Sequence, residues 1–177
     1  MIIQQNTSYD DQGQAVRFIL HDWRDFSKLT PITQSYAFIF NKEGKILIGK
    51  NPKSTKDSWS IPGGTLEEGE SPDQALEREL LEEVDAVCSR YEVIAIQECL
   101  FPGNPKANEG EHYYQLRYAG LLGELKEQTP DPDSGKVWER KFVDVKELPD
   151  HIYWGTQARV IAELAWEEIQ KWLDEER

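Results

Sequence analysis

The sequence contains few residues of the kinds that form disulfide frameworks or zinc sites. Its 177 residues include two cysteines, Cys88 and Cys99, and three histidines that are scattered along the chain. Two cysteines do not make a disulfide framework, and the histidines lack the spacing of zinc ligands. We therefore expect two buried thiols in a reducing cytosol, and hence a cytoplasmic protein.

Long apolar runs and basic clusters are also missing. No apolar run approaches roughly 20 residues, the length that a membrane helix needs, and the first residues lack the basic flank and apolar core of a signal peptide. Lysine and arginine together account for 20 residues, against 33 aspartates and glutamates, so the formal net charge is -13. Broad binding to nucleic acid requires a basic surface that displaces phosphate counterions. The sequence therefore predicts neither a membrane nor a nucleic-acid partner.

The composition is that of one globular domain. Hydrophobic residues make up 38% of the chain and aromatic residues 11%, which is enough for a substantial core. Residues 1–30 are expected to be an N-terminal extension made of strands, with one strand at Val16 to Leu20. Residues 31–177 are expected to be the main domain. The only candidate boundary is the break near Thr30 and Pro31.

Strand and helix patterns alternate along the main domain. Residues 31–50 predict a hairpin with its turn at 41–44, and further strands are expected at 91–98, 112–122 and 141–145. Apolar residues at helical spacing from Ile161 to Leu173 predict an amphipathic C-terminal helix. Hairpins combined with two helices predict an α/β fold in which a mixed sheet lies between helices, an α/β/α sandwich.

The second expected helix lies within the acidic stretch GGTLEEGESPDQALERELLEEV, residues 63–84. Ser71 can cap this helix, Pro72 suits its first position, and Gln74 completes a capping box. Before the helix, the glycine pair permits a turn with unusual backbone angles. An apolar stripe one turn apart is expected to face the core: Leu76, Leu80 and Val84.

Three carboxylates lie on an adjoining arc of the same helix: Glu79, Glu82 and Glu83. Like charges at this spacing weaken a helix by about 0.2–0.5 kcal/mol per pair. Carboxylate oxygens gathered in this way suit Mg²⁺, with Mn²⁺ as a substitute, and such an ion would bridge an anionic substrate such as a diphosphate. The acidic pair Glu167 and Glu168 near the C-terminus has no glycine loop before it, and we assign it no function.

The same stretch resembles the Nudix box, which reads Gly, five residues, Glu, seven residues, Arg-Glu, an aliphatic residue, any residue, Glu-Glu, any residue, Gly and an aliphatic residue. Gly64, Glu70 and Arg78 stand in register, followed by Glu79, Leu80, Glu82 and Glu83. Asp85 departs from the pattern because it replaces the family's second glycine, with Ala86 as the aliphatic residue. Aspartate adopts the left-handed conformation of a helix end at some cost.

The resemblance implies a role for each residue of the box. Glu79, Glu82 and Glu83 would bind the metal ion, and Glu79 would also be a candidate to orient the attacking water. Arg78 would orient these groups and pair with Glu70. Gly63 and Gly64 would shape the loop and offer backbone groups to a metal ion or a phosphate.

Nudix hydrolases usually recruit one more acid from outside the box. Glu139 is our candidate, because the segment that follows it is similar to the family's closing strand; its rivals are Glu109, Glu111 and Asp133. Aromatic residues could stack on a base. The candidates are Trp59, Phe101, Tyr113, Tyr114, Trp138 and Trp154, of which we select Trp59 and Tyr114.

The resemblance implies Mg²⁺-dependent hydrolysis of a diphosphate linkage in a nucleotide sugar, ADP-ribose or a related small nucleotide. Residues 47–50 and 112–114 are faintly similar to GDP-mannose mannosyl hydrolases, which is one alternative. A non-catalytic Nudix nucleotide sensor is another. Isopentenyl-diphosphate isomerase chemistry is a third alternative, but the sequence contexts of Cys88 and Cys99 do not suit it. The acidic balance disfavours mRNA decapping, and the extension is similar to added strands through which related diphosphatases often form homodimers.

Overall fold

The computed structural model describes residues 1–9, 13, 15–54, 59–101 and 112–176. Its strands are β1 (Ile2–Tyr9), β2 (Ala15–His21), β3 (Ile32–Phe40), β4 (Ile46–Lys50), β5 (Gly63–Thr65), β6 (Ala86–Leu100), β7 (His112–Leu125) and β8 (Glu139–Val143). Its helices are α1 (Pro72–Val84), the short α2 (Leu148–His151) and α3 (Thr156–Glu175), with a 3-10 helix at Val145–Glu147.

The described strands form one mixed sheet in the order β1-β2-β6-β7-β3-β4-β8, with β5 paired to β3. Strands β3 and β7 run parallel, whereas the other pairs are antiparallel. The N-terminal extension joins this sheet, because β2 pairs with β6 from Arg17 opposite Leu100 to His21 opposite Ile96. Strands were expected there, and their pairing makes the extension one edge of the main sheet.

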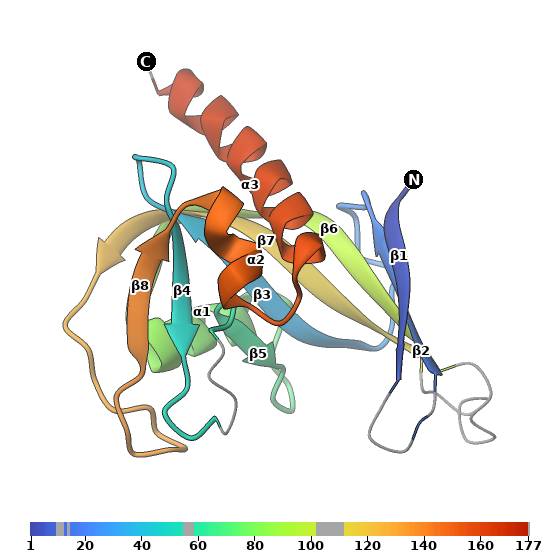
Figure 1. Ribbon diagram of the computed structural model, residues 1–177, viewed down its shortest axis with the longest axis horizontal. Coiled ribbons are helices and arrows are strands. Elements are labelled where there is room, and N and C mark those ends of the chain that lie inside the picture. The colour runs from blue at the N-terminus through green and yellow to red at the C-terminus, as the bar shows by residue number, and fades with distance from the viewer. Residues whose placement is uncertain (10–12, 14, 55–58, 102–111, 177) are drawn as a thin grey trace.

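Helices cover both faces of the sheet, as Figure 1 shows for α3 on one side and α1 behind it. Side chains along β3 point alternately to the two faces of the sheet, so this strand contributes to both hydrophobic cores. Phe38 and Phe40 pack in the core beneath α3, and Ala37 and Ile39 pack in the core beneath α1. The predicted α/β/α sandwich is therefore confirmed.

Local sequence signals located the start of α1, whereas the strands expected at 91–98 and 112–122 are longer, at Ala86–Leu100 and His112–Leu125. Ser71 and Gln74 form both hydrogen bonds of the expected capping box, and α3 buries the apolar stripe that its spacing predicts. The strand expected at 141–145 ends earlier, at Val143. Asp144 and Glu147 form a second capping box that starts the 3-10 helix, so the backbone turns away before Val145.

The two cysteines are free and lie within or near the core, as expected. Cys99 is fully buried and Cys88 is half-buried; burial raises the pKa of Cys99 to about 11 and that of Cys88 to about 12. Both thiols therefore stay protonated and unreactive near neutral pH. Within the described residues, we find no helix with the length and apolarity required to cross a bilayer.

Candidate active site

Two consecutive glycines bring the loop before α1 against the helix. Gly63 has φ +136°, and a Cβ there would lie 2.2 Å from the carbonyl oxygen of Ser35 on β3. A Cβ on Gly64 would lie 2.3 Å from Oε1 of Glu79. Only residues without side chains allow this approach, so the loop backbone and the α1 carboxylates share one small site.

Backbone and side-chain donors hold all three carboxylates in place. The N–H of Gly63 donates to Oε2 of Glu83 at 2.9 Å. Nη1 of Arg78 donates to Oε1 of Glu79 at 3.0 Å and to Oε2 of Glu82 at 3.2 Å. The loop and the helix are thereby joined through the predicted metal ligands themselves.

Arg78 also makes the expected pair with Glu70. Its Nε and Nη2 donate to the two oxygens of Glu70 at 2.8 and 3.0 Å, and Nη2 also donates to the carbonyl of Thr65 at 3.0 Å. The hydrogen bonds from Arg78 lower the pKa of Glu70 to about 2. Arg78 is therefore fixed by a bidentate contact on one side and offers Nη1 to the glutamates on the other.

The site retains an excess of negative charge. Burial raises the pKa of Glu79 in spite of Arg78, and nearby Glu82 and Glu70 raise it further. Burial raises the pKa of Glu83 well above its usual range, and the charges of Glu79, Asp131 and Glu82 add to this effect. Within the described residues no three acidic, histidine or cysteine side chains converge as a metal cage. Oxygens of Glu79 and Glu83 instead accept hydrogen bonds from Arg78 and Gly63. Carboxylate oxygens are the ligands that hard divalent cations prefer, and a bound cation would offset the repulsion between these carboxylates.

The predicted extra acid lies on the neighbouring edge of the sheet. Glu139 opens β8, its side chain is 65% exposed, and its carboxylate lies 3.8 Å from Nζ of Lys50. Its role as a further ligand stays a prediction. Of its rivals, Asp133 is exposed, whereas Glu109 and Glu111 lie outside the described residues.

Asp131 is an acid that the sequence analysis missed. It is buried, accepts a hydrogen bond from the indole of Trp138 at 3.0 Å and one from the backbone of Ser134 at 2.6 Å, and contributes to the raised pKa of Glu83. Its sequence context, DPDSG, indicates only a turn. Nothing in that pattern distinguishes a buried aspartate from the exposed Asp133 two residues later.

The aromatic candidates separate into distinct environments. Trp59 is half-buried, with Nζ of Lys141 4.3 Å from its ring centre. Tyr114, which we expected to bind substrate, is only 8% exposed and packs with the core beneath α1, so it has little surface left for a base. Trp138 is also buried. Tyr113 and Trp154 instead line a pocket that the sequence analysis did not anticipate.

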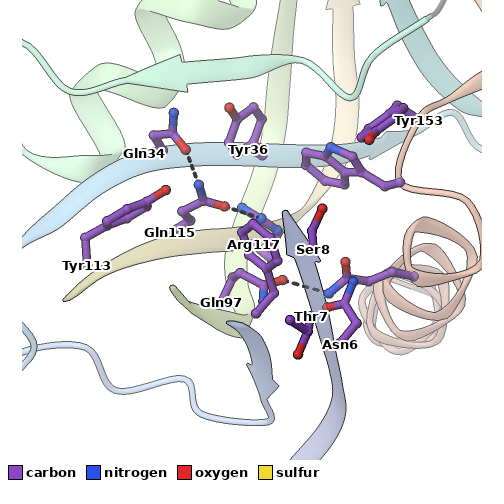
Figure 2. A pocket seen from close by; sticks show the side chains of 13 residues that line it. Asn6, Thr7, Ser8, Gln34, Tyr36, Gln97, Tyr113, Gln115, Arg117 and Tyr153 are labelled. Carbon is purple, nitrogen blue, oxygen red and sulfur yellow. Dashed lines mark hydrogen bonds between the residues drawn. The ribbon is translucent and has the colours of Figure 1, made fainter. Parts of the chain in front are cut away.

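This pocket, shown in Figure 2, has a volume of about 620 Å³. Tyr36 lines it and lies opposite Gly63 in the pairing of β3 with β5. Burial raises the pKa of Tyr36, and the charges of Glu83 and Glu79 add to that effect, so the pocket and the carboxylates are electrostatic neighbours. Its polar lining comes from several strands and α3, including Gln34, Gln97, Gln115, Arg117 and Gln157.

The NUDIX domain family model matches residues 32–164. A NAD-capped RNA hydrolase from Vibrio atlanticus is 30% identical over 129 residues, which cover 73% of this chain and 44% of the relative. An RNA pyrophosphohydrolase from Bartonella clarridgeiae is 28% identical over 132 residues, or 63% of this chain and 75% of the relative. The chain thus spans less than half the length of the first of these relatives. Since both relatives carry RNA in their names, the absence of a nucleic-acid partner stays a prediction.

Solved structures share the fold. An ADP-ribose pyrophosphatase from Streptococcus suis has a TM-score of 0.54 and 23% identity over 78% of this chain and 92% of its own. A Bacillus subtilis pyrophosphohydrolase has a TM-score of 0.55 and 14% identity over 78% of this chain and 77% of its own. The family match covers more than half of the chain, and its sandwich and acidic helix agree with that match. The chain therefore belongs to the Nudix family.

Proposed function

We propose that this protein is a Mg²⁺-dependent hydrolase that cleaves a diphosphate linkage in a nucleoside diphosphate derivative, such as a nucleotide sugar or ADP-ribose. Family membership supports the class of reaction. The observation that carries the proposal is the contact of the Gly63–Gly64 loop with the carboxylates of Glu79 and Glu83. An acidic cluster built against a backbone turn suits a substrate that arrives with a divalent cation.

Glu79, Glu82 and Glu83 would hold Mg²⁺, or Mn²⁺ in its place, together with a backbone group of Gly63. When bound, the ion would neutralise diphosphate oxygens and lower the pKa of a coordinated water. The chemistry of the donor set supports this assignment, because carboxylate oxygens are the ligands that these ions prefer. The ion would relieve the repulsion among the carboxylates, which adds to burial in raising the pKa of Glu79 and Glu83.

The side chains around the cluster position its carboxylates. Arg78 is anchored by Glu70 and holds Glu79 and Glu82 through Nη1, so it acts as a positioning residue. The N–H of Gly63 fixes Glu83. Glu79 would also accept a proton from the attacking water.

We retain Glu139 as the additional acid from outside the box. The start of β8 is tied to the end of α1, because Nη1 of Arg140 donates to the carbonyl of Val84 at 2.7 Å. Glu139 is one residue before Arg140, and because side chains alternate along a strand its own side chain starts on the opposite face of the sheet, so it would have to turn around the start of β8 to reach the glutamates. Its side chain is 65% exposed and its carboxylate lies 3.8 Å from Nζ of Lys50, so this ion pair is too weak to hold it in one position.

The decisive experiment is a substrate panel with product identification. Nucleoside diphosphates, nucleotide sugars, dinucleoside polyphosphates and nucleoside triphosphates are incubated with Mg²⁺ or Mn²⁺ and the wild-type protein. Glu82→Gln and Glu83→Gln are expected to lower turnover by about 10²-fold or more while the fold is retained. Glu167→Gln, an exposed glutamate on α3, is the matched control and should keep full turnover. Substantial turnover by either α1 variant would disprove the ligand assignment.

The panel also separates the alternatives. Hydrolysis in ¹⁸O-labelled water places the label on phosphate if attack occurs at phosphorus, and on the sugar if the chain acts like a GDP-mannose mannosyl hydrolase. Binding without turnover would indicate a sensor. A second candidate substrate is the 5′ end of RNA, which the names of two relatives favour. An oligonucleotide with a 5′-triphosphate tests it, and the net charge of -13 predicts slower turnover than with a small nucleotide.

A further inference from the structure

The pocket that Tyr36 lines contains a buried cation. Arg117 on β7 is 3% exposed, and Figure 2 shows it between Gln115 and Gln97 in the middle of the pocket lining. Its guanidinium carbon lies 5.0 Å from the ring centre of Tyr36 and 4.7 Å from that of Trp154. Both rings lie within cation–π distance of the guanidinium, and the two rings are nearly perpendicular to each other, at 83°.

No carboxylate balances this charge within the described residues. The residues that line the pocket are aromatic, hydroxyl or amide side chains apart from Arg117 itself. Burial lowers the pKa of Arg117 to about 10, which still leaves it protonated near neutral pH. Although the chain contains 33 acidic and 20 basic residues, no acidic side chain is among the described residues that line the pocket around this arginine.

Two buried donors in this pocket lack acceptors among the residues that the structure describes. Nε of Arg117 has no hydrogen-bond partner there, while its Nη2 donates to Oε1 of Gln115. Nε2 of Gln97 also has no partner, although its Oε1 accepts from Gln157 at 2.8 Å. Buried donors are normally satisfied in folded proteins. Both of these groups would be satisfied by a ligand that brings several acceptor oxygens and a negative charge.

We propose that this pocket binds an oxyanion of the substrate, a phosphate monoester or a carboxylate, on the part of the molecule beyond the cleaved diphosphate, with Arg117 as its counter-ion. The proposal rests on the proposed function for the position of the diphosphate. Tyr36 links the two sites, because it lines the pocket and lies opposite Gly63, whose N–H holds Glu83. A bidentate guanidinium matches phosphate or carboxylate geometry.

One wall of the pocket comes from outside the part of the chain that matches the family model. Asn6, Thr7 and Ser8 on β1 line it, and they precede the part of the chain that matches the family. Figure 2 shows this strand passing along the pocket opposite the glutamines. The N-terminal extension thus encloses the proposed anion site and restricts the size of the group that enters.

Calorimetry on the intact protein in EDTA tests the pocket without the metal site. The probes are ribose 5-phosphate, glucuronate and, as the neutral control, ribose. Saturable binding of either anion but not of ribose is expected, and the bound probe identifies the phosphate or carboxylate class. Arg117→Gln should weaken that binding about tenfold or more, whereas Arg159→Gln, an exposed arginine paired with Glu163 on α3, should not.

A second variant keeps the test valid if Arg117→Gln does not fold. Gln97→Leu removes a pocket donor at similar volume and should weaken anion binding while Glu82→Gln leaves it unchanged. Equal binding of ribose, no saturable anion binding, or wild-type affinity in the folded pocket variants would overturn the proposal. Anion binding without turnover on the panel would support this site and contradict the proposed function. Turnover without anion binding would support the proposed function and contradict this site.

Discussion

Asp85 offers a sharp test of how this chain replaces the glycine of the Nudix box. Its backbone is left-handed, with φ 47° and ψ 44°, at the end of α1. Its carboxylate accepts hydrogen bonds from the backbone N–H and the hydroxyl of Thr129, each at 2.9 Å. Its carbonyl accepts from Lys126 at 2.8 Å. The aspartate therefore ends the helix and anchors the segment that leads to β8.

Restoring the family glycine by Asp85→Gly should destabilise the fold. Glycine would relieve left-handed strain of about 1 kcal/mol. The change would remove two hydrogen bonds to a carboxylate, each contributing about 1.5 kcal/mol at the lower end of the range because Thr129 is exposed to water. The expected net loss is about 2 kcal/mol, or a decrease in Tm of roughly 4–8 °C for a domain of this size.

Urea unfolding of four proteins measures this difference: wild type, Asp85→Gly, Thr129→Val and the double variant. We expect the double variant to lose less than the sum of the single losses, because both substitutions remove the same hydroxyl contact. Asp85→Asn, which keeps an acceptor oxygen, should lie between wild type and the glycine variant. If Asp85→Gly were as stable as wild type or more so, backbone strain would outweigh the hydrogen bonds and the reasoning would be refuted.

Three further substitutions probe the loop and the acidic pair near the C-terminus. Gly64→Ala should fold normally but lower turnover by about tenfold or more, because its Cβ would displace the carboxylate of Glu79; unchanged kcat with an unchanged melting temperature would contradict the close approach. Gly63→Ala should cost about 2 kcal/mol or more in urea unfolding, since its Cβ would meet a backbone carbonyl and its φ is +136°. Arg24 lowers the pKa of Glu168 to about 2. The folded pKa lies below the unfolded value, so this pair stabilises above about pH 4.5 and the gain is lost as pH falls toward 2. Glu168→Gln should therefore lose about 1 kcal/mol at pH 7 and show a flatter stability profile between pH 5 and 2.

Local signals explain why the acidic helix could be predicted from sequence. The capping box at Ser71 and the apolar stripe of α1 depend on residues three and four positions apart. Contacts along the box are also short in sequence, such as Arg78 with Glu70. A pattern of twenty residues therefore contained nearly all the information needed to place them.

Long-range pairing explains what the sequence did not reveal. Glu168 was assigned no function because it sits in an ordinary acidic pair, yet it is nearly buried and binds Arg24, 144 positions earlier in the chain. Arg117 lies in a strand with no charge pattern around it. It has no acidic partner among the described residues of the pocket, because the side chains that β6 and α3 place beside it are neutral amides, Gln97 and Gln157. Such pairings depend on strand order and helix placement, which alternation along a single strand does not determine.

The opposite charges of the two neighbouring sites bear on how so acidic a protein could accept a polyanionic substrate. The α1 carboxylates would repel a diphosphate unless a divalent cation accompanied it. Arg117, by contrast, carries its positive charge without a metal ion and is separated from that cluster by Tyr36 and Gly63. A substrate with anionic groups at both positions would meet a cation at each. Selectivity would then depend on the distance between its two charges, because a molecule with only the diphosphate would leave the donors of Arg117 and Gln97 unsatisfied.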